Sequence, residues 1–292
     1  MAEDSNIRIG FPNRVDGAFL SGGAWTGPLP LDNLKDRLFS RVARSVDVDP
    51  SSTRFEVDFG RQRSIQIIAL IAHNLSFSAR VRIRASDQSN FSALLYDKTQ
   101  DAWGSLVDAD WDINTLEWEN DNYWAGTFTQ EETEGQTAVS SFILDEPISA
   151  RYWSFDIIDP QNVDGFVDIG RVFIGDGFLN PDINMAYGAS LGYETDTVVE
   201  KALGGAEFFD PRESLRVMRF SLPFMSEEEG FGRALELTRR AGIHREVFVV
   251  ADPTDEIFGP QRNFLGRLRQ LSPLEQAMFQ LTSMSFEIKE LR

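Results

Sequence analysis

Apolar and charged residues alternate in several short stretches of the first half of the chain, and this pattern predicts β-strands. In residues 54–59 every second side chain is apolar, as expected for a strand with one buried face. Residues 65–72 instead form a nearly continuous, β-branched apolar run, which is typical of a central strand buried on both faces. Gly60 separates the two stretches, so we expect two strands here.

The same period of two recurs farther along the chain. In residues 79–85 we expect Val81 and Ile83 to point inward, and the outward positions are Arg80, Arg82 and Arg84. Further strands are predicted at 140–144, 152–158 and 166–174. Short strands with turn residues between them and no helical period favour a mainly β fold that begins with an antiparallel sandwich.

The composition changes near residue 178, and the second part of the chain has mixed patterns. Strands are predicted at 215–222 and 246–251, and Met284, Phe286 and Ile288 have the spacing of a final strand. A short helical turn at 272–275 is also compatible with the sequence. We therefore predict two domains: a sandwich in residues 1–178 that carries a long acidic, Trp-rich loop (99–150), and a small α+β assembly domain in residues 179–292.

One helix is predicted in this second part, at residues 226–241. Ser226 is a suitable N-cap, Glu229 completes a capping box with it, and Gly242 follows the last turn. Phe231 and Leu235 lie one turn apart, Thr238 extends the same face, and this face is expected to be the packed one.

The most unusual segment lies between Lys98 and Arg151, where no Lys or Arg occurs. It contains twelve Asp or Glu residues and four of the six tryptophans. Carboxylates stay in water, whereas indoles need to be covered or bound. The candidate ligand-binding residues, which could stack on sugar rings, are Trp111, Trp118, Tyr123 and Trp124. The alternative is that such aromatic residues pin the loop by packing. A cation, the three outward arginines or basic groups of a neighbouring subunit can neutralise the loop. We predict that it docks partly on the arginine face and is completed by a partner.

Part of the acidic segment matches an EF-hand calcium loop. The candidate calcium ligands, which supply hard oxygen atoms at alternate positions, are Asp108, Asp110, Asp112, Asn114 and Glu119. Ile113 stands where the sharp turn of that loop needs glycine, and no flanking helix pair is evident. A solvated acidic turn is the alternative, so the expectation is no cofactor, with calcium as the one metal to test by chelation.

Charge and composition exclude several functions. The formal net charge of −18 argues against binding to nucleic acid or to an anionic membrane surface. Residues 1–180 have a net charge of −13 (28 acids, 15 bases) and residues 181–292 of −5 (18 acids, 13 bases), so the second part is the better candidate for packing against neighbouring subunits. The chain has no cysteine, and its N-terminus lacks the pattern of a signal peptide. The longest apolar run is too short to span a bilayer.

No catalytic machinery is evident. The segment from Gly188 to Gly192 matches the nucleophile elbow of hydrolases with Ser190 as nucleophile, and His244 follows downstream. That chemistry needs a strand-to-helix turn, whereas the following residues are predicted to form a strand. Glycoside hydrolysis needs two carboxylates at a set separation, and any two of the 46 acids could meet that condition. The presence of acids is therefore no evidence for this reaction. His73 ends an apolar strand and is expected to be a packed histidine. We therefore expect a protein that is not an enzyme.

Several segments together resemble the discoidin or galactose-binding-like jelly roll over roughly residues 6–178. They are the Gly-rich start with Gly23-Ala-Trp25 and Leu31-Asp-Asn33, the strand Phe55–Gly60 with the strand after it, and Arg151–Ile157 followed by Val167–Gly175. This resemblance implies a sandwich of two antiparallel sheets.

A narrower resemblance is to tail-tip or baseplate proteins of tailed bacteriophages. It rests on His73–Ser76, on the Trp-rich segment Leu116–Gly126 and on Arg219–Ser226, although Glu117 stands where that family tends to have proline. The resemblance implies a structural virion component, made in the host cytoplasm, that assembles with copies of itself and with other tail proteins. The alternative is a carbohydrate-binding module that recognises a host glycan through the Trp-rich acidic loop. Neither implies membrane insertion.

Overall fold

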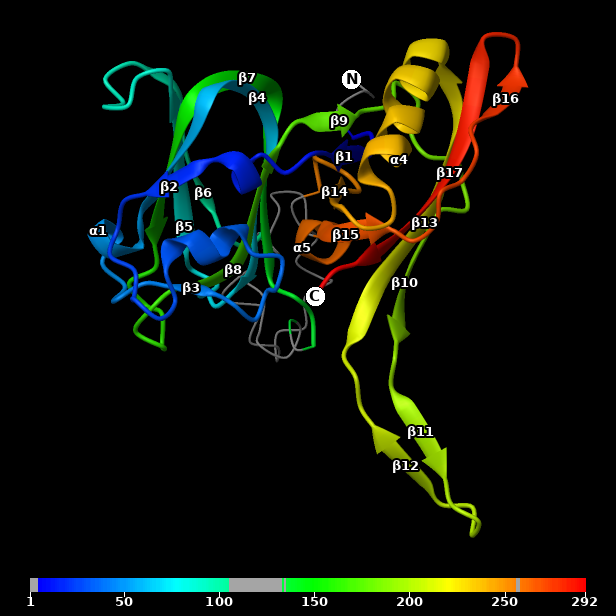
Figure 1. Ribbon diagram of the computed structural model, residues 1–292, viewed down its shortest axis with the longest axis horizontal. Helices are drawn as coiled ribbons and strands as arrows, with labels where there is room; N and C mark the ends of the chain where they lie inside the picture. Colours follow the sequence, from blue (N-terminus) through cyan, green and yellow to red (C-terminus); the bar gives the residue numbers. More distant parts are fainter. Residues whose placement is uncertain (1–4, 105–132, 134, 256–257) are drawn as a thin grey trace, which may run out of the picture.

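The computed structural model describes residues 5–104, 133, 135–255 and 258–292. Figure 1 shows a sandwich at the N-terminal side, a second sheet with a helix beside it, and a two-stranded arm that projects from that sheet. The expected fold class, mainly β with antiparallel sheets, is confirmed.

The sandwich is built from one antiparallel sheet with strand order β3-β8-β4-β7-β5-β6, and β2 pairs with β4. Its strands are β2 (Phe19–Ser21), β3 (Ala43–Arg44), β4 (Phe55–His73), β5 (Arg80–Ser86), β6 (Leu94–Asp101), β7 (Val139–Ile158) and β8 (Asp168–Gly175). Short helical turns lie between them: η1 (Val15–Gly17), η2 (Leu31–Lys35) and α1 (Pro50–Thr53).

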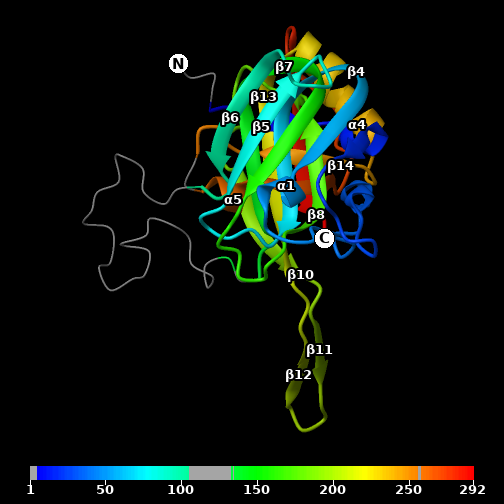
Figure 2. The ribbon, with the colours of Figure 1, turned by 90° about the vertical axis from the view of Figure 1, so that its left-hand side faces the viewer.

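Two long strands turn this sheet into a sandwich. The first half of β4 pairs with β2 and with the second half of β7, whereas its second half pairs with β8 and the first half of β7. The pairing shifts between Asp58 and Arg63, and Gly60 between them has a φ of 68°. Figures 1 and 2 show the resulting curved pair β4–β7 crossing from one layer to the other. The sequence pattern predicted two strands separated at Gly60, but the structure has one strand, β4, that bends there. The stretches predicted at 140–144 and 152–158 likewise belong to one strand, β7.

Every second side chain along these strands points into the space between the layers. Side chains of both layers meet in one core, which includes Phe55, Val81, Phe155, Leu70 and Val172. The inward orientation of Val81 and Ile83 is confirmed, since both are fully buried.

The second sheet has the strand order β10-β13-β17-β15-β14-β1-β9, with β16 paired to β17. Its strands are β1 (Arg8–Gly10), β9 (Gly177–Leu179), β10 (Ser190–Thr195), β13 (Ser214–Ser226), β14 (Glu246–Val250), β15 (Phe264–Leu268), β16 (Glu275–Met278) and β17 (Leu281–Glu290). A helical turn, α5 (Gly259–Arg262), precedes β15. The final strand is as predicted, but the turn considered at 272–275 is wrong, because the chain there leads into the β16–β17 hairpin.

Both faces of this sheet are covered. One face packs on the helical segment η4 (Glu228–Ala234) and α4 (Leu235–Ala241), and the other packs on the outer face of the sandwich, where Phe173 stacks on Phe248. Strand β1 comes from the N-terminal part of the chain yet pairs with β14 and β9 in this sheet. The division at residue 178 stays a prediction, and the first strand lies across it.

The predicted helix is present, with its capping box. The Ser226 N–H donates to the Glu229 carboxylate at 2.7 Å, and the Glu229 N–H donates back to Ser226 Oγ at 3.3 Å. Of the predicted packed face, Thr238 is buried but Phe231 and Leu235 are exposed. The buried apolar residues are Ala234, Leu237 and Ala241. The first turns are π-helical, with more residues per turn than an α-helix, so an α-helical wheel places Phe231 and Leu235 wrongly.

Candidate functional site

The sequence-predicted site residues lie outside the described residues. This holds for the aromatic set Trp111, Trp118, Tyr123 and Trp124, and for the calcium set Asp108, Asp110, Asp112, Asn114 and Glu119. Their roles stay predictions. The structure does correct the bounds of the loop, because β6 continues to Asp101 and β7 begins at Val139.

The one tryptophan of the acidic segment that the structure describes is a packing residue. Trp103 is buried, its indole N–H donates to the Leu75 carbonyl at 3.1 Å, and its ring contacts those of His73 and Phe77. His73 is buried too, as expected for a packed histidine: its Nε2 lies 2.8 Å from Ser140 Oγ, and its Nδ1 accepts the Leu75 N–H. Burial lowers the pKa of His73 to about 3, so its ring is neutral.

Two of the three outward arginines of β5, Arg82 and Arg84, pair with acids of the sandwich itself. Arg82 forms a bidentate pair with Asp97 at 2.7 and 2.6 Å, and Arg84 lies 2.8 Å from Asp156. Strand β5 has neighbours on both sides, β6 and β7, which supply these acids. The sequence could not show this pairing, because β6 was not predicted as a strand.

A cleft of about 360 Å³ opens where the acidic segment leaves the sandwich. Strands β6 and β7 form one wall, and the segment around α5 forms the other. The lining residues include Lys98, Gln100, Asp101, Ser141, Asp145, Asp255 and Asn263. The second wall is fixed by Asn263, whose Nδ2 donates to Ser141 Oγ at 3.0 Å and whose Oδ1 accepts the Ala251 N–H at 3.1 Å.

The chemistry of this cleft suits a polar, uncharged ligand. Gln100 Oε1 is buried and has no hydrogen-bond partner within the described part of the chain. Asp101 and Asp145 add acceptors and Lys98 adds a donor, and none of the three forms an ion pair with a described residue. Hydroxyl groups can satisfy donors and acceptors of both kinds.

The second unusual feature is the projecting arm, which we define as residues 196–213. It consists of β11 (Val198–Lys201) and β12 (Glu207–Asp210), joined by a turn in which Gly205 has a φ of 87°. The arm continues the β10–β13 edge of the second sheet and extends away from the body in both ribbon views (Figures 1 and 2). Every residue of the arm except Thr197 is exposed.

The arm carries large apolar side chains that nothing in the described chain covers. Its exposed apolar residues are Val198, Val199, Leu203, Phe208 and Phe209. Phe208 and Phe209 are 63% and 62% exposed, and they point to opposite faces because successive side chains of a strand alternate. The base of the arm is held by Thr197, whose Oγ1 accepts the Arg212 N–H at 2.9 Å. A two-stranded ribbon without a core is only marginally stable in water.

Comparisons with known proteins identify no family. No protein-family description matches the sequence, and no curated protein matches it. Some solved structures do match in part. The family 32 carbohydrate-binding module of Clostridium perfringens NanJ, in complex with galactose, matches 57% of this chain and 99% of its own length, with 17% identity and a TM-score of 0.36. The same module type from AlyQ, in complex with 4,5-unsaturated mannuronic acid, matches 53% of this chain and 92% of its own length, with 14% identity and a TM-score of 0.32.

A family 89 glycoside hydrolase from Clostridium perfringens matches 57% of this chain but only 15% of its own length, with 14% identity and a TM-score of 0.38. At these identities and TM-scores the matches carry no argument about ligand or activity.

The hydrolase-like motif does not lie in the context that its chemistry needs. Ser190 begins the exposed strand β10 of an antiparallel sheet rather than a strand-to-helix turn. His244 precedes β14, which lies four strands away in the sheet, roughly 19 Å at the usual strand spacing. The two side chains therefore cannot act on one substrate.

Two searches of the described residues gave negative findings. No group of three or more His, Asp or Glu side chains there is placed to hold a metal ion. Within the same ranges, no helix is long and apolar enough to cross a membrane.

Sequence reasoning missed both the arm and the cleft. The signal for the arm lies in residues 198–209, where apolar residues occur at neighbouring positions on both sides of a turn. Gly204 and Gly205 mark that turn. The cleft had no local signal, because its walls come from segments more than 100 residues apart in the sequence.

Proposed function

We propose that this chain is a non-enzymatic structural protein that assembles with copies of itself through the projecting arm. The observation that carries this proposal is the projecting two-stranded arm of residues 196–213, whose five large apolar side chains are exposed. An exposed strand edge also offers unpaired N–H and C=O groups to a neighbouring chain. Covering both would stabilise the arm and join two subunits.

The rest of the molecule supports a structural role. The sandwich and the second sheet share an apolar interface and the buried ion pair of Arg171 and Glu246, so force on the arm reaches the sandwich through packed elements. The resemblance to tail-tip proteins would place such an assembly in a phage tail, with other tail proteins as further partners and the sandwich facing outward.

Sedimentation velocity over a range of concentrations tests this proposal. The wild type should self-associate, whereas the double substitution Phe208→Ser and Phe209→Ser should remain monomeric, because it removes the apolar groups that the partner would bury. The matched control is Phe279→Ser, which changes a phenylalanine that is 86% exposed in the β16–β17 turn. A wild type that is monomeric at every concentration, or a double variant that assembles normally, would overturn the proposal.

A second candidate function is recognition of a sugar in the cleft between β6–β7 and α5. The buried, unpartnered Gln100 Oε1 favours it, together with the carboxylates of Asp101 and Asp145 and the Lys98 amine. Carboxylate acceptors bind sugar hydroxyls through charge-assisted hydrogen bonds. The Trp-rich acidic loop, which joins this wall at Gly104, is the other candidate surface for the same ligand.

A glycan array, followed by calorimetry on any hit, separates the two surfaces. Binding in the cleft should weaken at least tenfold in Gln100→Ala and Asp145→Asn, and stay unchanged in Asp32→Asn, an exposed control outside the cleft. Binding lost only in Trp111→Ala, Trp118→Ala or Trp124→Ala would assign the sugar to the loop instead. If the wild type binds no glycan, the assembly function is the only one of the two that remains.

A further inference from the structure

Five arginines gather on one side of this acidic protein, where three parts of the fold meet. We call them the arginine cluster: Arg14, Arg61, Arg63, Arg233 and Arg240. Arg61 and Arg63 lie just after the Gly60 bend of β4, Arg14 lies in the loop after β1, and Arg233 and Arg240 lie on η4 and α4. A chain with 46 acids and 28 bases has ample carboxylate to pair with them.

Contacts between these segments hold the cluster together. The Arg14 N–H donates to the Ile174 carbonyl at 2.8 Å, and Ser64 Oγ, next to Arg63, lies 3.4 Å from the Asp176 carboxylate. On the helix side, the guanidinium groups of Arg233 and Arg240 lie 5.6 and 5.4 Å from the ring centre of Phe178 in β9. Arg240 also lies 5.3 Å from the Phe11 ring.

The cluster is short of anions. Among the described residues, Arg14, Arg61, Arg63 and Arg233 form no ion pair, and the carboxylate nearest to Arg240 is Glu236 at 3.9 Å. Arg14 Nε is buried without a hydrogen-bond partner. The pKa of Arg14 is lowered first by burial and then by the charges of Arg63 and Arg240, and the Asp176 carboxylate opposes this only in part. A ligand that brings carboxylates would relieve this repulsion.

The arm has the complementary chemistry. Residues 196–213 contain five acids and two bases, a net charge of −3. The register places Val198, Glu200, Phe208 and Asp210 on one face, so this face is both apolar and acidic. Glu200 has no ion pair among the described residues, and Asp210 pairs only with the exposed Arg212 at 2.7 Å. Lys201 and Glu207 on the opposite face pair with each other at 2.8 Å.

One chain cannot make this contact with itself. Figure 1 shows the arm projecting at the bottom of the view, away from β9, α4 and the β4–β7 bend at the top, which are the elements that carry or contact the cluster. A second molecule can bring its arm to the cluster without any change of fold.

We propose, as a refinement of the assembly function above, that the arginine cluster of one subunit binds the acidic, apolar face of the arm from a second copy of this chain. Carboxylates of Glu200 and Asp210 meet the guanidinium groups, while Phe208 packs beside Phe178. The contact joins two different surfaces, so subunits add head to tail and form a closed ring or an open filament.

Mixing two variants tests this proposal, because each keeps one half of the contact. The first carries Arg61→Glu and Arg63→Glu, which reverses the cluster but leaves the arm. The second carries Phe208→Ser and Glu200→Lys, which disables the arm but leaves the cluster. Each alone should self-associate at least about tenfold more weakly than the wild type, since like charges would then oppose the contact. An equimolar mixture should form a heterodimer, in which the first variant supplies the arm and the second the cluster.

The control is the double substitution Arg80→Glu and Arg245→Glu, which reverses two exposed arginines outside the cluster and should assemble like the wild type. Thermal unfolding of every variant shows that it is folded, and Arg61→Ala with Arg63→Ala replaces the first variant if it is not. Normal assembly by the cluster variant would contradict the proposal but leave the assembly function intact, provided that the arm variant fails to assemble. A mixture that stays monomeric would also overturn it. Normal assembly by the arm variant would overturn both.

Discussion

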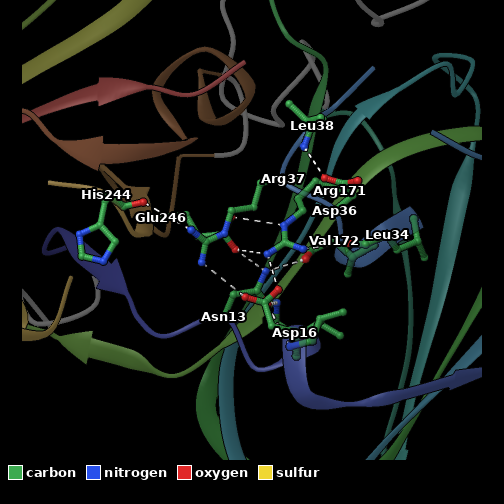
Figure 3. Close-up of polar contacts among 12 residues, drawn as sticks. Asn13, Asp16, Leu34, Asp36, Arg37, Leu38, Arg171, Val172, His244 and Glu246 are labelled. Carbon is green, nitrogen blue, oxygen red and sulfur yellow. Dashed lines mark hydrogen bonds and ion pairs between the residues drawn. The ribbon is translucent and has the colours of Figure 1, made fainter. Parts of the chain in front are cut away.

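Arg171 of β8 and Glu246 of β14 form a buried ion pair that joins the sandwich to the second sheet. Arg171 donates to the two Glu246 oxygens at 2.5 and 3.3 Å, and the side chains are 0% and 3% exposed. Asn13 donates to the same carboxylate at 2.7 Å, and Arg171 also reaches Asp16 and the Leu34 carbonyl (Figure 3). Four segments distant in the sequence therefore meet at one guanidinium group.

Removing one partner of this pair should be costly. Arg171→Met leaves Glu246 buried without its cation, and we expect the free energy of unfolding to fall by about 3–5 kcal/mol. The matched control is Arg82→Met, which breaks the more exposed pair with Asp97 and should cost less than about 1 kcal/mol. Urea denaturation of both variants measures the difference, and equal losses would contradict this account.

The buried His73 should make stability depend on pH. Its pKa in the folded state is about 3, below its ordinary value of 6.5, so the unfolded chain binds a proton that the folded chain excludes. The contribution of neutral His73 is complete above pH 6.5 and is lost as the pH falls toward 3. Between pH 7 and 5 the loss should reach about 2 kcal/mol. His73→Gln should unfold in urea with a smaller change between these pH values, and an unchanged pH dependence would count against the assignment.

Gly23 and Gly60 share a positive φ, 67° and 68°, but differ in their surroundings. A Cβ on Gly23 would lie 2.3 Å from the Arg54 carbonyl oxygen, whereas a Cβ on Gly60 would meet nothing within 4 Å. Gly60→Ala should therefore cost about 1 kcal/mol for its backbone conformation alone. Gly23→Ala should cost about 1–3 kcal/mol more, because backbone atoms must move. Melting temperatures of the two variants provide the test.

The arm should be the part of the second sheet most sensitive to proteases while the protein is monomeric. Its ribbon has no core, and its backbone is exposed. Limited trypsin digestion of dilute protein should cut after Lys201 before it cuts after the buried Arg216, and assembly at high concentration should protect Lys201. Equal cutting at both concentrations would show that the arm is not covered by a partner.

Local patterns were sufficient for much of the fold. The alternation at Val81 and Ile83 placed β5 with the correct buried face, and the spacing of Ser226 and Glu229 identified the capped start of the helix. Such signals depend on neighbours in sequence. The pattern at Gly60 was misleading because a glycine with positive φ can bend a strand as well as end it. The two strands predicted on either side of Gly60 form one strand, β4, because β7 pairs with both halves.

The candidate sites depended on contacts that no local pattern encodes. The acidic segment attracted attention through its charge, yet two of the three arginines expected to neutralise it, Arg82 and Arg84, pair with Asp97 and Asp156 of adjacent strands. The arginine cluster assembles from residues 14, 61, 63, 233 and 240, which are scattered among many other arginines in the sequence.

The sequence by itself determined the antiparallel strands, the capped helix and the acidic character of the chain, because these follow from the order of residues within one element. Only the tertiary structure decided that β1 joins the second sheet, that Arg171 and Glu246 are buried together, and that residues 196–213 stand free of any core. Burial and pairing over long sequence distances depend on which elements pack together, and that choice is made by the whole chain at once.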